Sequence, residues 1–198
     1  MYLYIDTTQY VCLGLLNEDF QWVDYCYIET KKSSQIIHKL IFELLEKAGT
    51  KLACISGLFY AAGPGSYTGM RVSEGIKDVL SWQNCPVYSF YHFNVPQLYN
   101  HDKGFWISKA FKGEFFVYEW TKSSSAKTLV LEKDLKEKLS NSKLFSGCEK
   151  FGPMDVALTK DLIYEKPEVL FRVLKEKKIT RELYYYRPLE EEFKRSNG

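Results

Sequence analysis

The first half of the chain begins with short apolar runs separated by polar turns and then changes to helical spacing. The apolar runs are Met1–Asp6, Tyr10–Leu16 and Phe20–Ile28, a pattern typical of an antiparallel meander of β-strands. Residues 35–48 then carry apolar side chains at helical spacing, and Gly49 stands where a helix commonly ends. The pattern predicts three strands followed by a helix.

A strand, a helix and another strand are expected next. Leu52–Ala62 is mainly apolar, so we expect a strand buried on both faces. A glycine-rich turn leads from it into a helix over residues 67–82, and Pro86–Phe90 is a short strand before a helical piece at 94–99. The first hundred residues are therefore predicted to fold in the order β-β-β-α-β-α-β-α.

The second half repeats this pattern in a shortened form. Its predicted strands are Phe105–Ala110, Glu114–Trp120, Thr128–Leu131 and Leu144–Gly147, the first two joined by a hairpin at 112–113. Its predicted helices are residues 133–139, 153–157 and 167–177. We therefore expect two related α/β domains, residues 1–100 and 101–198, the second shorter and degenerate.

Composition and charge exclude several classes of protein. Hydrophobic residues make up 45% of the chain and aromatic residues 16%, which favours a folded globular protein. The net charge of +2 is too small for a nucleic-acid-binding surface over the whole molecule. Residues 1–100 carry 7 basic and 9 acidic residues, which leaves 20 and 16 for the rest. We interpret this mild basic bias of the second half as a solvated face.

The cysteines and histidines do not indicate a metal centre. The five cysteines are Cys12, Cys26, Cys54, Cys85 and Cys148. Their number is odd and no pair is spaced C-x-x-C, so we expect neither a disulfide framework nor a zinc site. The three histidines have no spacing that would put two imidazoles on one helix face.

The start of the chain indicates a cytoplasmic protein. It begins directly with a predicted strand, without the basic and apolar segments of a leader peptide. No stretch reaches the roughly 18 apolar residues that a membrane-spanning helix needs. We therefore expect a protein of the reducing cytoplasm that does not contact membranes.

The most distinctive motif is the run Gly63–Arg71, GPGSYTGMR, between a predicted strand and a predicted helix. Ser66 and Thr68 are candidate caps of that helix. The run is not a Walker phosphate loop, because Met70 and Arg71 stand where Lys and Ser or Thr would have to be. An anion could rest on the helix N-terminus, but the residue types favour a tight strand-to-helix turn.

Asp6, Thr7 and Thr8 are the other candidate ligand residues. A carboxylate and two hydroxyls after a strand suit a magnesium-bound phosphate, although such residues more commonly satisfy the backbone of a hairpin. Ser66 lies in the wrong frame for the G-x-S-x-G motif of hydrolases and has no evident His or Asp partners. We assign no catalytic residue.

Four segments together resemble the TsaB (YeaZ) family: Ile5–Thr8, the glycine-rich run through Arg71, Gly113–Glu114 and Tyr186–Arg187. Bacterial proteins of this family take part in making threonylcarbamoyladenosine beside the anticodon of tRNA. The resemblance covers nearly the whole chain, and the glycine-rich run is its specific part. It implies a two-domain actin-like, hexokinase and Hsp70 (ASKHA, ribonuclease H-like) fold, in which each domain is a five-stranded mixed sheet flanked by helices.

The resemblance implies a scaffold and not an enzyme. In the family the transferase is TsaD, which carries metal-binding histidines on its first helix, whereas TsaB binds TsaD and the ATPase TsaE joins them. The corresponding helix here has only His38. We therefore expect a TsaD-like transferase and a TsaE-like ATPase as partners, at most indirect or weak contact with tRNA, and no cofactor of the chain's own. A homodimer, and a nucleotide at the interface with the partner, stay open.

The first two helices form the partner contact in this family. The interface residues that the resemblance implies are Ile36, Leu40, Leu44, Gly69, Val72, Ser73 and Ile76. The apolar arc of residues 35–48 spans about 180°, wider than the roughly 100° that packing on a sheet requires, and Phe42 lies about 60° beyond its edge. The surplus arc would suit a partner, or a second helix of the same chain. Asp6, Thr7 and Thr8 would be vestigial nucleotide contacts.

Three departures from the family limit what is carried over. The second hairpin reads Lys109–Glu114 where the family usually has Asp-Ala-Arg before Gly-Glu, which weakens a nucleotide contact there. Glu74, Lys77 and Asp78 interrupt the apolar pattern of the second helix, and the second domain is short.

The alternative function is an ATP-binding phosphotransferase or ATPase of the same fold, although residues 6–9 lack the glycine of its phosphate hairpin.

Overall fold

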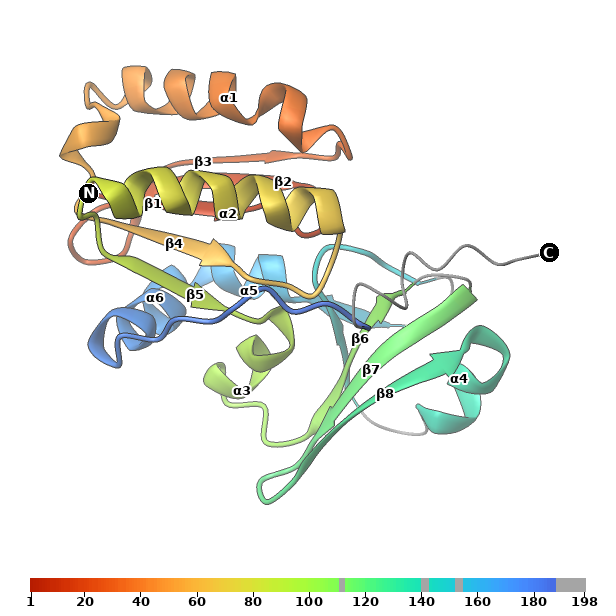
Figure 1. The fold of residues 1–198 in the computed structure, drawn as a ribbon. Coiled ribbons are helices and arrows are strands. Elements are labelled where there is room, and N and C mark those ends of the chain that lie inside the picture. Colours follow the sequence, from red (N-terminus) through yellow and green to blue (C-terminus); the bar gives the residue numbers. More distant parts are fainter. Residues whose placement is uncertain (111–112, 140–142, 152–154, 188–198) are drawn as a thin grey trace.

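The computed structural model describes residues 1–110, 113–139, 143–151 and 155–187, which form two five-stranded mixed sheets flanked by helices (Figure 1). The strands are β1 (Tyr2–Asp6), β2 (Val11–Leu16), β3 (Trp22–Ile28), β4 (Gly57–Ala61), β5 (Val87–Phe90), β6 (Gly104–Lys109), β7 (Glu114–Trp120), β8 (Ser125–Leu131), β9 (Leu144–Ser146) and β10 (Val156–Leu158). The helices are α1 (Ser33–Lys47), α2 (Tyr67–Trp82), α3 (Val95–Leu98), α4 (Glu132–Lys138), α5 (Thr159–Glu165) and α6 (Pro167–Glu176), with 3-10 turns at Leu52–Cys54 and His92–Asn94.

The two sheets have the same topology. The first has the order β3-β2-β1-β4-β5 and the second β8-β7-β6-β9-β10. In each, an antiparallel meander of three strands is followed by two strands that add in parallel on the other side of the first strand. The predicted duplication of the strand pattern is therefore confirmed.

The first sheet is covered by helices on both faces. Alternate side chains of a strand point to opposite faces, so Leu3 and Ile5 face α1 and α2 while Tyr2 and Tyr4 face the other side. Figure 1 shows α1 and α2 above this sheet and α3, α5 and α6 below it. Residues of α5 and α6 from the second half of the sequence thus complete the core around the first sheet.

The second sheet packs one face on α4 and the other on an aromatic cluster. Leu135 of α4 lies in the core cluster that contains Phe105 and Ile107, whereas Trp106 packs with Phe93 and other aromatic side chains on the opposite face. The aromatic cluster therefore fills the space between the second sheet and the segment that follows β5.

Residues 179–187, here called the C-terminal strap, join the two sheets. The Ser89 amide of β5 donates to the Ile179 carbonyl at 3.0 Å, and the Tyr184 amide donates to the Ala62 carbonyl at 2.8 Å. The Arg187 guanidinium then pairs with the Glu114 carboxylate of β7, at 2.6 Å from Nη2 to Oε1. Two parts of the family resemblance that are far apart in sequence thus form one ion pair.

The predicted helix boundaries agree closely with the structure. The second helix spans residues 67–82 as predicted, and the Ser66 hydroxyl caps it by accepting from the Gly69 amide at 3.3 Å. Gly49 ends the first helix with a φ of +63°, a conformation that glycine adopts without strain.

Two sequence predictions were wrong. The strand expected over Leu52–Ala62 begins only at Gly57, because Leu52–Cys54 forms a 3-10 turn. The helix expected at 153–157 is instead strand β10 over Val156–Leu158, which pairs in parallel with β9 and completes the second sheet; residues 152–154 lie outside the described part. Short apolar runs do not distinguish a strand from a helix, so pairing with a neighbour decided the outcome.

The predicted hairpin turn at 112–113 lies partly outside the described residues, which resume at Gly113. Among the helices that are described, none has the length and apolar character needed to cross a membrane.

Candidate functional site

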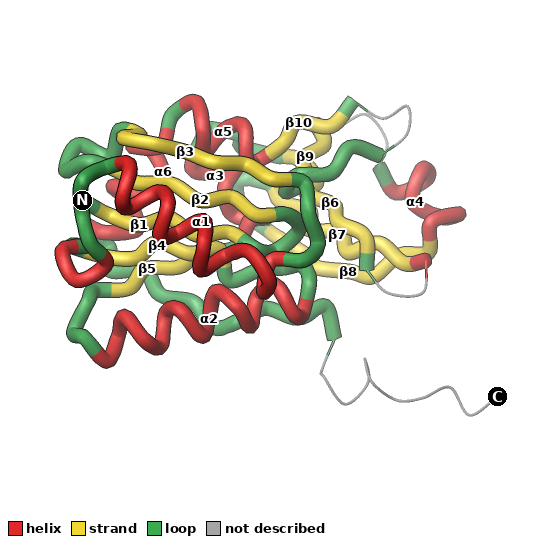
Figure 2. Tube along the Cα trace, turned by 90° about the horizontal axis from the view of Figure 1, so that it is seen from above, coloured by secondary structure: helices red, strands yellow, loops and turns green. Residues whose placement is uncertain are grey.

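An apolar groove of about 780 Å³ lies between α1 and α2. The two helices lie side by side on one face of the first sheet (Figure 2). Ile41 and Leu45 of α1 and Leu80 of α2 form its floor and are buried, since they also pack in the core below. The groove is therefore an opening between two helices that already cover the sheet.

Large apolar side chains remain exposed around this groove. Phe42 of α1 is 63% exposed and Val79 of α2 is 44% exposed, and both line the groove. Trp82, the last residue of α2, is 81% exposed. Apolar side chains gathered on one exposed face commonly mark a protein interface, whereas scattered ones need no explanation.

Charged residues form the rim of the groove. His38 and Glu46 contribute from α1 and Arg71 from α2. Arg71 pairs with Glu74 and also lies over the rings of Tyr67 and Tyr185, at 5.6 Å and 5.7 Å from their centroids. The pairing with Glu74 raises the pKa of Arg71, so the guanidinium stays charged. An apolar centre with a charged rim is the usual anatomy of a protein interface.

The seven interface residues implied by the resemblance occupy different environments. Val72 and Ile76 line the groove. Ile36 and Leu40 are half-buried against the core below α1, and Leu44 is buried in it. Of these five residues, only Val72 and Ile76 line the groove, whereas Ile36, Leu40 and Leu44 pack with the chain's own core.

Gly69 and Ser73 lie inside the chain's own core. A Cβ atom on Gly69 would stand 1.9 Å from the Thr7 carbonyl oxygen, so only glycine allows α2 to approach β1 this closely. The Thr7 hydroxyl donates to the Gly69 carbonyl at 2.5 Å and lies 2.6 Å from the Ser73 hydroxyl. The small residues of α2 are thus explained by contact with the loop after β1.

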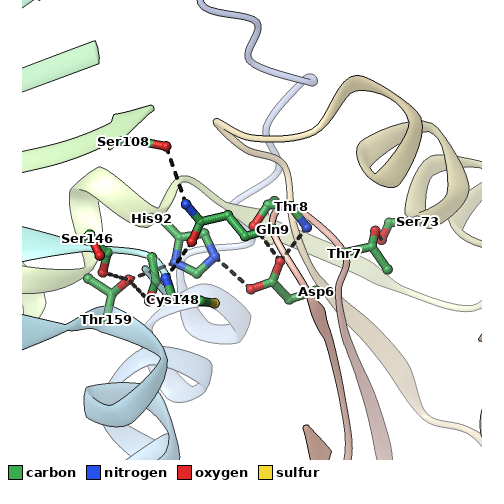
Figure 3. A network of polar contacts seen from close by, with 11 residues as sticks. Asp6, Thr7, Thr8, Gln9, Ser73, His92, Ser108, Ser146, Cys148 and Thr159 are labelled. Carbon is green, nitrogen blue, oxygen red and sulfur yellow. Dashed lines mark hydrogen bonds and ion pairs between the residues drawn. The ribbon is translucent and has the colours of Figure 1, made fainter. Parts of the chain in front are cut away.

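Asp6 is the centre of a buried polar network (Figure 3). Its Oδ1 accepts from the amide and the hydroxyl of Thr8, at 2.8 Å and 2.7 Å, and its Oδ2 lies 2.7 Å from His92 Nε2. His92 Nδ1 in turn lies 2.9 Å from the hydroxyl of Thr159, which donates to the Ser146 carbonyl. The network links β1 to the start of α5 and to β9.

The hydrogen bonds of this network indicate its charges. Burial acts to raise the pKa of Asp6, but the bonds and charge of His92 and the bonds from Thr8 prevail and lower it. Because the Thr159 hydroxyl donates its proton to Ser146, it can only accept from His92 Nδ1. The Asp6 carboxylate is thus held by the amide and hydroxyl of Thr8 on one oxygen and by His92 Nε2 on the other.

The candidate nucleotide residues are occupied by the chain itself. Asp6, Thr7 and Thr8 are all buried, and the glycine-rich run packs directly on them. The Ser66 amide donates to the Thr8 carbonyl at 2.5 Å, and a Cβ atom on Gly65 would stand 2.2 Å from the same oxygen. The two predicted ligand motifs meet, and a cavity of about 360 Å³ beside them is lined by Thr8, Gly65 and Ser66.

Sequence reasoning missed several residues of these sites. Phe42 could have been identified as a surface contact, since it is aromatic and yet lies outside the apolar arc of its helix. His92 and Thr159 gave none, because no spacing relates residues that only the fold brings to Asp6. Val79 was not among the predicted interface residues.

Comparison with known proteins agrees with this fold and these motifs. A family model described as TsaD, tRNA N6-adenosine threonylcarbamoyltransferase, matches residues 28–95. The chain is 33% identical over 79 residues to the tRNA threonylcarbamoyladenosine biosynthesis protein TsaB of Escherichia coli strain K12. That match covers 40% of this chain and about a third, 34%, of the length of the E. coli protein.

Two solved structures from Pseudomonas aeruginosa share the fold. YeaZ has a TM-score of 0.60 at 16% identity, over 89% of this chain and 93% of its own. An uncharacterized protein with similarity to peptidase YEAZ has a TM-score of 0.59 at 16% identity, over 92% of this chain and 99% of its own. The predicted ASKHA-like fold is thereby confirmed, and over the matched 79 residues the chain is similar to TsaB.

Proposed function

We propose that this chain is a non-catalytic subunit that binds and activates a TsaD-like transferase in the formation of N6-threonylcarbamoyladenosine on tRNA. The observation that carries the proposal is the apolar groove between α1 and α2, which is lined by the exposed side chains of Phe42 and Val79. The sheet below is already covered by the buried residues of the same helices. The exposed apolar surface is therefore available to another protein.

The buried state of Asp6, Thr7 and Thr8 supports a role without a nucleotide site of the chain's own. Their hydroxyl and carboxylate oxygens already hold hydrogen bonds within the chain. We expect the isolated chain to bind ATP weakly or not at all in calorimetric titrations with magnesium. Tight magnesium-dependent binding would instead favour a phosphotransferase or ATPase.

Co-purification of this chain with the TsaD-like protein of the same cell tests the proposal. The test variant is Val79→Glu and the matched control is Val23→Glu, since Val23 is 48% exposed on β3, away from the groove. A charge placed in an apolar interface is left without solvent, so Val79→Glu should abolish the complex while Val23→Glu retains it. Circular dichroism verifies that both variants fold.

Three outcomes have different meanings. Loss of the complex only in Val79→Glu supports the proposed surface. No complex with the unmodified chain, or equal retention in both variants, contradicts it. If the unmodified chain instead forms a dimer that Val79→Glu dissociates, the same surface serves a second copy. A TsaE-like ATPase and a nucleotide are expected to join only the assembled pair.

A further inference from the structure

Two cysteines and a carboxylate from opposite halves of the chain meet beneath the polar network. Cys12 lies on β2, Asp6 ends β1, and Cys148 follows β9 of the second sheet. All three side chains are buried, and their sulfur and oxygen ligand atoms lie within 4.8 Å of one another. In Figure 3 the Cys148 sulfur points toward the Asp6 carboxylate.

The spacing of these atoms is close to that of a zinc site. Zinc binds thiolate sulfur at about 2.3 Å and carboxylate oxygen at about 2.0–2.2 Å, so two sulfurs around a tetrahedral ion stand about 3.8 Å apart. Two thiolates select zinc over the hard cations magnesium and calcium, which prefer oxygen ligands.

The surrounding groups fit a first ligand shell. Thr8 and His92 hold the Asp6 carboxylate from both sides, and Oδ2 keeps a lone pair beyond its bond to His92. A histidine behind a ligating carboxylate is the kind of contact that orients metal ligands. The Cys148 amide donates to Gln9 Oε1 at 2.5 Å, which ties the Cys148 segment to the loop after β1.

The charges at this point would also balance. Two thiolates neutralise one divalent cation. A buried site without excess charge avoids the desolvation cost that an uncompensated ion carries.

We propose that Cys12, Cys148 and Asp6 bind a Zn²⁺ ion that fastens the second half of the chain to the first sheet. Three protein ligands leave one position of a tetrahedral site for water. The site is separate from the groove between α1 and α2, and it needs no partner protein.

Titration of the full, reduced and metal-stripped chain with Co²⁺ tests this proposal, because Co²⁺ replaces Zn²⁺ and its absorption reports tetrahedral thiolate ligation. We expect one ion per chain, with thiolate-to-cobalt charge-transfer bands that Zn²⁺ abolishes. Cys12→Ser and Cys148→Ser should weaken binding by at least about tenfold. Cys54→Ser is the matched control, since Cys54 is exposed.

Thermal unfolding gives a second readout. Zn²⁺ should raise the melting temperature of the unmodified chain and of Cys54→Ser but not of Cys12→Ser. Cys12→Ala and Cys148→Ala replace the serine variants if those fail to fold. Absence of charge-transfer bands in the unmodified chain, or equal binding by the cysteine variants, overturns the proposal whether or not a partner protein binds.

Discussion

The two faces of the first sheet are covered to different degrees. On the face of Tyr2 and Tyr4, α6 brings Leu170 and Phe171 into full burial. On the face of Leu3 and Ile5, α1 and α2 bury their inner side chains but leave a groove with an exposed Phe42. The first face is complete within the chain, whereas the second presents apolar surface to solvent.

The difference separates the side chains that stabilise the fold from those that are available to bind another protein. Side chains of α6 contribute to folding because they lose all contact with water. Phe42 and Val79 contribute little to folding, since they stay largely exposed in the isolated chain. Substitutions on the two faces should therefore affect different measurements.

The largest expected effect is that of Phe171→Ala on the completed face. Phe171 is fully buried and its ring lies 4.8 Å from Phe59 and 5.3 Å from Tyr4. Its removal should lower the free energy of unfolding by about 3–5 kcal/mol, measured by urea denaturation. Phe42→Ala should change it by less than about 0.5 kcal/mol. Equal losses would remove the distinction between the two faces.

Two glycines of α2 sharpen the comparison within one helix. Gly69→Ala would force a Cβ atom against the Thr7 carbonyl and should destabilise the fold by about 1–3 kcal/mol. Gly75 lines the groove and has no neighbour within 4 Å of an added Cβ, so Gly75→Ala should stabilise by about 0.5–1 kcal/mol. Chemical denaturation of both variants would reveal opposite signs; the same sign in both contradicts the packing described.

A smaller effect is expected where the strap reaches the second sheet. Arg187→Ala removes a two-oxygen ion pair with the partly buried Glu114, and should cost about 0.5–1 kcal/mol. Lys122→Ala is the control, because Lys122 pairs with Asp102 in full exposure and should give no measurable change. Thermal unfolding of both variants in low and high salt measures the two losses of stability. If both losses depend equally on salt, the Arg187–Glu114 pair behaves as an ordinary surface ion pair.

Most of the fold was predictable from the sequence, because its signals are local. Helix α2 was predicted from apolar spacing, the cap at Ser66 and the preceding glycine turn. Strand β10 was not, since three residues with no turn signal become a strand only when β9 is beside them. The duplicated architecture was also visible in the repeated pattern of the two halves, and the resemblance to a known family agreed with it.

The candidate sites were predictable only in part. The helices that form the groove were identified, but the burial of Gly69 and Ser73 depends on the loop after β1, which no helical projection includes. The meeting of Cys12 with Cys148 depends on how the second half docks onto the first sheet. Residues that only the tertiary structure brings together have no characteristic spacing in the sequence.

Binding titration against the TsaD-like protein tests the central claim most directly, using one exposed aromatic residue from each side of the molecule. Phe42→Ala removes an aromatic side chain from the groove, and Tyr164→Ala removes a comparably exposed one, 52% exposed, from α5. The account predicts that Phe42→Ala weakens binding by about tenfold or more and Tyr164→Ala by less than about twofold. Equal affinities for the two variants, or a larger loss with Tyr164→Ala, would contradict it.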